Sequence, residues 1–170
     1  MKNIINRLLL LLVMAIVAFS CKEDDEFSDL VRDNRPAVPV TFPGATTFGF
    51  NPYIDKSLAA LNAGEPITFT LAIPENSGRT IREITKVGAG ATAINAGTLN
   101  SASYTEAPIA GSGTTATFTT TLDEFKTKRP TVPTTTVAAP GFRELAFIFL
   151  VTLDDDTQIV TQQVRVRIRP

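Results

Sequence analysis

The 170-residue sequence has no histidine, no tryptophan and only one cysteine. Without histidine or a second cysteine, the chain holds no internal disulfide, no zinc or iron site built from these two residue types and no histidine-based catalytic triad. The sequence also lacks an excess of positive charge, because 16 basic residues stand against 17 acidic ones. Nucleic-acid binding needs a basic surface that displaces counterions from phosphate. We therefore expect no nucleic-acid partner, and we also expect no metal ion or other cofactor.

The first 20 residues have the parts of an export signal in the usual order. Lys2 and Arg7 give a positive start, residues 8–19 are unbroken apolar, and the small Ser20 ends the segment. A membrane-spanning helix is the rival interpretation, but residues 8–19 would cover only about 18 Å of a hydrocarbon layer roughly 30 Å thick. We therefore predict a cleaved signal peptide over residues 1–20. The mature chain then has 14 basic and 17 acidic residues, a net charge near −3.

Residues 17–21 read VAFSC and contain the only cysteine. This stretch resembles the lipobox of bacterial lipoproteins, although Ala18 and Phe19 stand where the commonest pattern has leucine and a small residue. The resemblance implies that Cys21 receives a diacylglyceryl thioether, becomes the new N-terminus and is then N-acylated. Two or three acyl chains hold a protein durably on a membrane, whereas one chain holds it only marginally. An ordinary secretory signal followed by an incidental thiol is the alternative interpretation.

A short charged segment follows the cysteine directly. It resembles the acidic export signal of surface lipoproteins of the Bacteroidota and consists of Lys22, Glu23, Asp24, Asp25 and Glu26. The resemblance implies a lipid-anchored protein of the outer membrane that faces the cell exterior. Periplasmic retention is the alternative, because acidic residues also keep a tether solvated and away from anionic headgroups. Residues 21–40 carry Pro36 and Pro39 toward their end, which is typical of a tether that stiffens toward a domain.

Residues 41–170 predict a single all-β domain, because apolar residues and threonine alternate with period two between clusters of Gly, Pro and Asn. The clearest strands are expected at residues 66–73 and 114–122, each with one apolar face and one threonine face. Residues 55–64 fit either a short helix or an edge strand. Weaker strand candidates lie at residues 42–50, 80–87 and 102–105. Residues 126–141, rich in proline and threonine, are interpreted as a long loop.

A C-terminal hairpin is the most informative pattern, with strands at residues 143–153 and 158–169 around an acidic four-residue turn. If Leu153 faces Gln158, the apolar residues of the two strands match on one face. Glu144 then falls opposite Arg167 on the other face. The predicted pairs are Val151 with Val160, Phe147 with Val164, Leu145 with Val166 and Glu144 with Arg167. Because the second face of the first strand (Ala146, Ile148, Leu150) is also apolar, we expect this strand to be central and covered on both sides.

About seven short strands and a closing hairpin suggest two packed antiparallel sheets in an immunoglobulin-like β-sandwich. The order of strand-like segments, ITFTLAI, IREITKV, TTATFTTTLDEF and then the hairpin, resembles small Bacteroidota lipoproteins with such a domain. Some members of that group accompany outer-membrane glycan-uptake systems. This resemblance lies only in the order and spacing of the strand-like segments, so no binding residue can be assigned from it.

Two glycine motifs and one acidic turn suggest ligands at first sight. Residues 88–93 and 111–116 both fit GxGxxA, but neither is followed by the helix that a dinucleotide fingerprint requires, so we predict flexible loops and no nucleotide. Asp154, Asp155 and Asp156 offer carboxylates to calcium. Three adjacent acids on a hairpin tip usually point apart, so a solvated turn is the preferred interpretation.

Four residues are candidates for ligand contact. Arg165, Arg167 and Arg169 alternate with apolar residues, which places three guanidinium groups about 7 Å apart on one face of the last strand. Such a row can bind sulfate, phosphate or uronate groups. More often it protects an exposed strand edge from pairing and balances neighbours such as Glu144, and we favour the protective role. Tyr53 is a candidate for stacking against a sugar.

Three function classes follow from these features. A lipid-anchored, non-catalytic component of a surface assembly needs only the anchor, the tether and the β domain, and it is the leading hypothesis. A carbohydrate-binding module is the alternative, and it would need exposed rings around Tyr53 or Tyr104. An enzyme would need two acids brought together, and the sequence links no such pair, so we predict no catalytic residues.

Overall fold

The computed structural model describes residues 36–48, 51–134 and 140–170. The predicted signal peptide, Cys21 and the acidic segment lie outside these residues. The part from Ala37 to Pro170 forms one compact unit.

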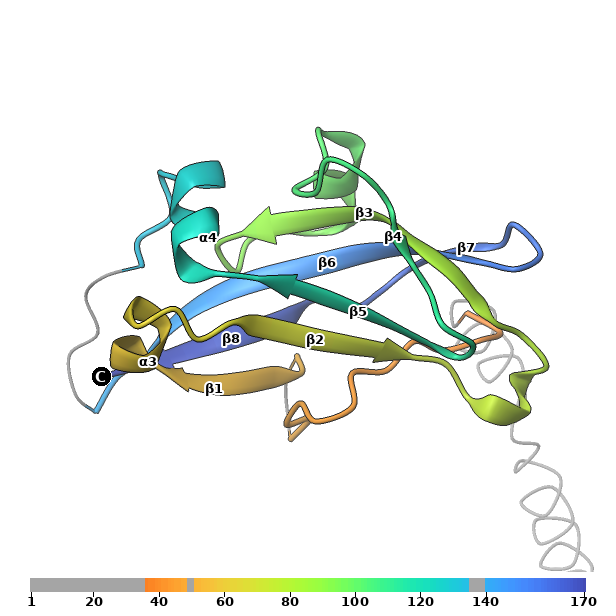
Figure 1. Ribbon diagram of the computed structural model, residues 1–170, viewed down its shortest axis with the longest axis horizontal. Coiled ribbons are helices and arrows are strands. Elements are labelled where there is room, and N and C mark those ends of the chain that lie inside the picture. Colours follow the sequence, from red (N-terminus) through yellow and green to blue (C-terminus); the bar gives the residue numbers. More distant parts are fainter. Residues whose placement is uncertain (1–35, 49–50, 135–139) are drawn as a thin grey trace, which may run out of the picture. The chain divides into compact units, whose positions relative to one another are not determined.

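Strands make up most of the regular structure, so a largely β fold is confirmed (Figure 1). Within the residues that the structure describes, the two helices and two 3₁₀ turns are short. The elements are β1 (Tyr53–Ser57), α3 (Leu58–Asn62), β2 (Ile67–Ala72), η1 (Glu75–Ser77), β3 (Ile81–Gly90), η2 (Ala96–Asn100), β4 (Ile109–Ala110), β5 (Thr115–Thr120), α4 (Leu122–Lys128), β6 (Arg143–Leu153), β7 (Gln158–Val160) and β8 (Val164–Arg169).

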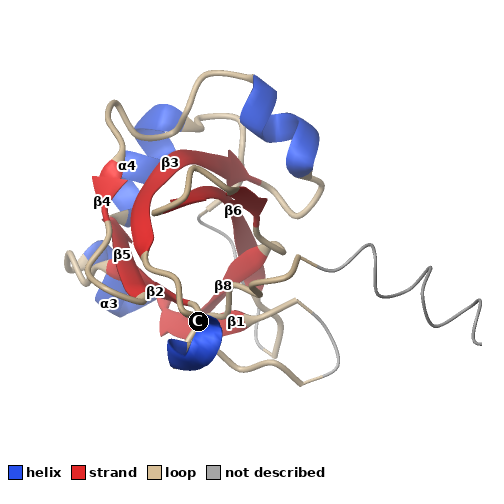
Figure 2. Cartoon of the chain, turned by 90° about the vertical axis from the view of Figure 1, so that its right-hand side faces the viewer, coloured by secondary structure: helices blue, strands red, loops and turns tan. Residues whose placement is uncertain are grey.

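The strands form two sheets that curl around a common core. The larger sheet has the order β1-β8-β6-β3-β4, with β7 also paired to β6, and the smaller sheet consists of β2 and β5. Seen end-on, β3, β4, β5, β2, β1, β8 and β6 follow one another around a ring (Figure 2). One pairing departs from the expected antiparallel arrangement, because β1 runs parallel to β8.

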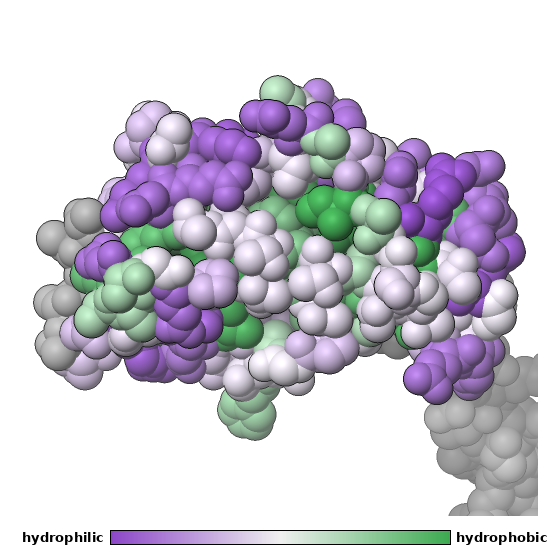
Figure 3. Space-filling view, in the orientation of Figure 1, coloured by the Kyte–Doolittle hydropathy of each residue, from purple (hydrophilic) through white to green (hydrophobic). Residues whose placement is uncertain are grey.

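The core is rich in aromatic side chains. Phe69 of β2 lies opposite Phe118 of β5, and both rings contact Phe147 and Phe149 of β6. The other face of β2 and β5 carries threonines, as predicted, and the hydroxyls of Thr68 and Thr119 lie 3.2 Å apart. This face is mostly pale in Figure 3, the colour of intermediate hydropathy.

Strand β6 is central, as predicted from its two apolar faces. It pairs with β3 along one edge and with β7 and β8 along the other. Phe147 and Phe149 face the core, whereas Ile148 lies on the outer face under the segment that contains η2. A Cβ atom on Gly88 would lie 2.8 Å from Ile148 and 3.5 Å from Leu99. Gly88 and Gly90 thus lie within β3, where the lack of a side chain leaves room for Ile94, Thr98 and Leu99 to pack over the outer face of the sheet.

The hairpin register is confirmed for β8 and wrong by one residue for β7. Glu144, Leu145 and Phe147 face Arg167, Val166 and Val164 as predicted, but Val151 faces Ile159. The cause is the turn, where Asp156 adopts a left-handed conformation (φ 68°) and shortens the loop to three residues. One extra residue between Val160 and Val164 then forms a bulge that restores the predicted register.

Some of the other predicted elements are present in the structure and some are not. The strands predicted at residues 66–73, 80–87 and 114–122 are present, and residues 55–64 hold the end of β1 followed by α3. Residues 102–105 form no strand, and the described part of 42–50 contributes only the bridge from Thr46 to Tyr53. Helix α4 was not predicted, and its last turn begins the segment interpreted as a loop. It starts where the Thr121 hydroxyl accepts a hydrogen bond from the Glu124 N–H.

Candidate functional site

The four candidate ligand residues lie on one outer surface. Residues 164, 166 and 168 of β8 point into the core, so the three arginines point outward, and Tyr53 of β1 pairs with Arg165 in the strand register. We define the arginine–aromatic surface as the outward side chains on β1, β8 and the start of β6. Its members are Tyr53, Asp55, Phe142, Glu144, Arg165, Arg167 and Arg169.

The protective role predicted for the arginine row is wrong, whereas the expected balancing of Glu144 by the row is confirmed. Strand β8 is not an edge strand, because β1 pairs with it along one side and β6 along the other. The row therefore cannot protect an exposed edge from pairing. The error arose because residues 53–57 were not recognised as a strand that joins β8 in parallel.

Glu144 binds two of the arginines. Its carboxylate accepts hydrogen bonds from Nη1 of Arg165 at 2.8 Å and from Nε of Arg167 at 2.9 Å. The Glu144 side chain is only 14% exposed, so the two guanidinium groups compensate for its loss of water. The predicted ion pair between Glu144 and Arg167 is confirmed. Nε of Arg165 also donates to Oε1 of Gln163 at 2.7 Å.

Two rings enclose the central guanidinium group. The Arg167 guanidinium carbon lies 3.5 Å from the centroid of the Tyr53 ring and 4.7 Å from that of Phe142. These are cation–π distances, which favour a planar cation between two aromatic faces. Phe142 is 45% exposed. Arg169 lies 5.6 Å from the Phe142 centroid and donates from Nε to Asp55 at 2.6 Å.

The surface has a small positive excess. It carries three guanidinium groups against the carboxylates of Asp55 and Glu144. Arg167 and Arg169 each bind a carboxylate through Nε, the inner nitrogen of the guanidinium group. The outer nitrogens of Arg167 and Arg169 are therefore held in place by the bonds behind them. Such held guanidinium groups can donate pairs of hydrogen bonds to a carboxylate or sulfate.

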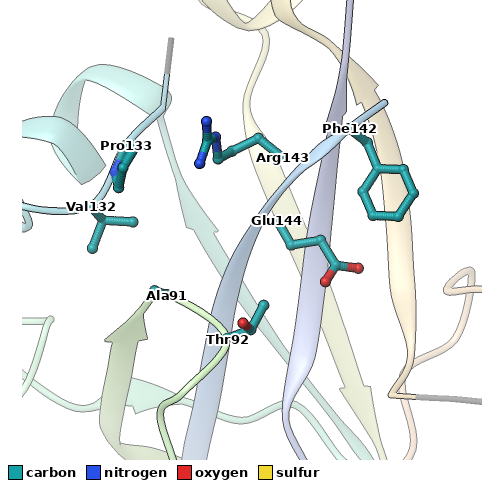
Figure 4. A pocket seen from close by; sticks show the side chains of 7 residues that line it. All are labelled: Ala91, Thr92, Val132, Pro133, Phe142, Arg143 and Glu144. Atoms are coloured by element: carbon teal, nitrogen blue, oxygen red, sulfur yellow. The ribbon is translucent and has the colours of Figure 1, made fainter. Parts of the chain in front are cut away.

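A shallow hollow of about 250 Å³ adjoins this surface (Figure 4). The side chains of Arg143 and Glu144 leave β6 in different directions, with Arg143 directed toward Val132 and Pro133. The hollow is lined by Ala91, Thr92, Val132, Pro133, Phe142, Arg143 and Glu144.

A second polar cluster joins α4 to the end of β5 and to Tyr104. The Tyr104 hydroxyl lies 2.7 Å from that of Thr120, which donates to Glu124 at 2.8 Å. Lys128 donates to Glu124 at 2.8 Å and to the Tyr104 carbonyl at 2.9 Å. Burial raises the pKa of Tyr104 to about 12, so its hydroxyl stays protonated at neutral pH. The Tyr104 side chain is buried and offers no exposed ring for a sugar.

The acidic turn between β6 and β7 is bound by two arginines that lie just before and within β3. Arg79 pairs with Asp154 and Asp155, and Arg82 pairs with Asp156. Within residues 36–48, 51–134 and 140–170, no group of three or more acidic side chains is arranged to hold a metal ion.

Sequence reasoning missed Phe142, which completes the surface. A signal was present, because Phe142 and Glu144 are two residues apart and period two places both on the same face. The extent of β6 was predicted correctly, but an aromatic residue one position before its first residue was not included.

Comparison with protein-family models, with curated proteins and with solved structures finds no match for this chain. Among the residues that the structure describes, no helix has the length and apolar character to cross a membrane.

Glu124 gives a pH-dependent prediction. The hydrogen bond from Lys128 is the main cause that holds the pKa of Glu124 below its ordinary value of 4.5. Its stabilising effect is therefore present above that value and lost as the pH falls through the lowered folded pKa. We expect Glu124→Gln to reduce the free energy of unfolding at pH 7 by about 0.5 kcal/mol, a small amount because the side chain is 40% exposed. The difference from wild type should shrink as the pH falls below 4.

Urea unfolding at pH 7 and pH 3.5 measures this effect. Asp123→Asn is the matched control, because Asp123 is 82% exposed and pairs with Lys126 on the same helix. It should change stability little at either pH. A constant difference between Glu124→Gln and wild type across this range would contradict the role given to the carboxylate.

Proposed function

We propose that this protein is a lipid-anchored, non-catalytic cell-surface protein that serves as a structural or accessory component of an outer-membrane assembly. The observation that carries the proposal is the lone Cys21, directly after an apolar leader and directly before an acidic segment. The compact unit from Ala37 to Pro170 follows this anchor.

The strand order supports an immunoglobulin-like domain as part of the proposal. In that fold one sheet has the order G-F-C with optional additions, and the other pairs strand B with strand E. Here β8, β6, β3 and β4 follow the first order, and β2 with β5 follows the second. Thr41 pairs with β2 and β1 pairs with β8, which corresponds to a first strand divided between the two sheets.

A non-catalytic role is supported by how the acidic side chains are used. Glu144 and Asp55 bind arginines of β8, Glu124 binds Lys128, and Glu65 binds Lys56. A carboxylate held by a cation in this way is a poor general acid, because the cation favours its ionised form.

The anchor is tested in cells that process lipoproteins normally. We expect Cys21→Ser to abolish labelling of the protein by radioactive palmitate and to release it from the membrane fraction, because no other residue carries the anchor. Ser20→Ala is the control, since it keeps a small residue before the cleavage site and should retain the label. Unchanged membrane association of Cys21→Ser would refute the proposed anchor. Protease treatment of intact cells then separates display on the exterior from periplasmic retention.

A carbohydrate-binding module is the second candidate, and one observation favours it. The exposed ring of Phe142 lies beside the guanidinium groups of Arg167 and Arg169. A ring of this kind can stack against the C–H face of a sugar while an arginine binds an acidic substituent.

This alternative is tested with arrays of neutral and uronate-containing oligosaccharides. If the surface binds glycans, Phe142→Ala should weaken binding by about tenfold, because a stacking contact contributes about 1 kcal/mol or more. Phe48→Ala is the matched control, since Phe48 is 90% exposed and lies outside the surface. Equal loss in both variants, or no binding by wild type, would remove this candidate.

A further inference from the structure

Strand β2 has one edge that forms no backbone pairing with another strand for most of its length. Its other edge pairs with β5 through the whole strand. On the free side, Thr41 and Ala72 exchange two backbone hydrogen bonds of 2.8 and 2.9 Å. The backbone groups of Ala72 therefore point away from β5. Because these directions alternate along an antiparallel strand, the N–H and C=O groups of Thr70 and Thr68 also point to the free side.

The chain's own pairing with this edge stops after Thr41. Pro43 and Gly44 follow, with Gly44 at φ 84°, and the Ala45 N–H closes a turn on the Phe42 carbonyl. The next pairing, between Thr46 and Tyr53, belongs to β1. No backbone partner for the outward groups of Thr68 or Thr70 lies within residues 36–48, 51–134 or 140–170.

This edge also lacks the usual protection against an additional strand. Edge strands are commonly very short or carry lysine and bulges that oppose pairing. In the larger sheet one edge strand, β4, has only two residues, and the other, β1, carries Lys56. By contrast, β2 has six residues, no bulge in its pairing with β5, and threonine at both positions whose outward backbone groups are unpaired. Pro66, just before the strand, has no N–H and therefore ends the series of outward backbone donors.

A hollow of about 530 Å³ lies beside this edge. Ile54 and Pro66 give it an apolar part, and the ion pair between Lys56 and Glu65 gives it a charged part. It is lined by Gly44, Thr46, Tyr53, Ile54, Asp55, Lys56, Glu65, Pro66 and Thr68. The free backbone groups of Thr68 are thus next to space that side chains of another chain can enter.

We propose that β2 binds an extended segment of a partner protein as an added antiparallel strand. The segment pairs with Thr68 and Thr70 in the row that Thr41 begins, and one of its side chains enters the hollow. An extended polypeptide is the ligand that matches this edge, because its own N–H and C=O groups alternate with the spacing of the strand. The inference rests on the proposed accessory function, since it names how a component of the assembly would be held.

The test uses the full-length chain, purified in detergent, and a heptapeptide selected against it from a phage-displayed random library. The peptide is then made with one N-methyl group at each position in turn. An added strand directs alternate amides toward β2, so methylation at every second residue should weaken binding at least about tenfold and methylation at the others should change it little. Amide hydrogen exchange should slow at Thr68 and Thr70.

A pair of proline variants gives an independent readout. Thr70→Pro removes an outward N–H without touching the β5 pairing, which proline at a strand edge permits, and it should weaken peptide binding at least about tenfold. Thr117→Pro is the matched control, because Thr117 faces Thr70 across the β2–β5 pair and points its N–H the other way. If Thr70→Pro does not fold, the methylation pattern on wild type still decides the question.

Three outcomes would overturn the proposal. Peptides whose affinity shows no alternation on methylation, or which protect amides of β8 but not those of β2, would place binding elsewhere, for example on the arginine–aromatic surface. Recovery of no peptide that depends on Thr70 would reject the edge as a binding site. A concentration-dependent dimer that protects Thr68 and Thr70 without peptide would identify a second copy as the occupant. None of these results bears on the palmitate labelling of Cys21, so the two proposals fail separately.

Discussion

The structure depends on one strand that is covered on every side. Residues 145–149 of β6 are all buried, and both edges of the strand are paired. A strand with two apolar faces can be stable only if a core lies against one face and a second layer lies against the other. The core face is filled by Phe147 and Phe149 with the rings of β2 and β5. The outer face is covered by the segment around η2, which β3 admits because Gly88 has no side chain.

The arginine–aromatic surface begins where this covering ends. At the start of β6 the outward residues change from Ile148 and Ala146 to Glu144. A carboxylate that is 14% exposed needs compensating charge, and the register of β8 places Arg167 directly opposite it. Tyr53 and Phe142 then enclose that guanidinium group. The same pairing that completes the sheet therefore builds the surface that we consider for ligand binding.

The sequence predicted the parts of the fold whose residues alternate regularly. Strands β2 and β5 follow period two without interruption, β6 was recognised by its two apolar faces, and the β8 register followed from matching apolar and charged residues on both faces. The errors lie where a single residue changes the geometry. The left-handed Asp156 moved β7 by one residue, and a capping pattern at Thr121 and Glu124 began a helix within an expected strand and loop. The parallel pairing of β1 joins residues more than a hundred positions apart, and a local pattern carries no sign of it.

The arginines of the candidate site show in the same way that a local pattern does not reveal which strands pair. Their shared face followed from alternation, but their role depended on whether β8 had a neighbour on each side, which only the assembled sheets reveal. Native-state amide hydrogen exchange tests the central position of β6 most directly. The account predicts that the amides of Phe147 and Val151 exchange only through global unfolding, with a free energy equal to that from urea denaturation. Exchange of these amides through a smaller opening, while β2 and β5 stay protected, would contradict it.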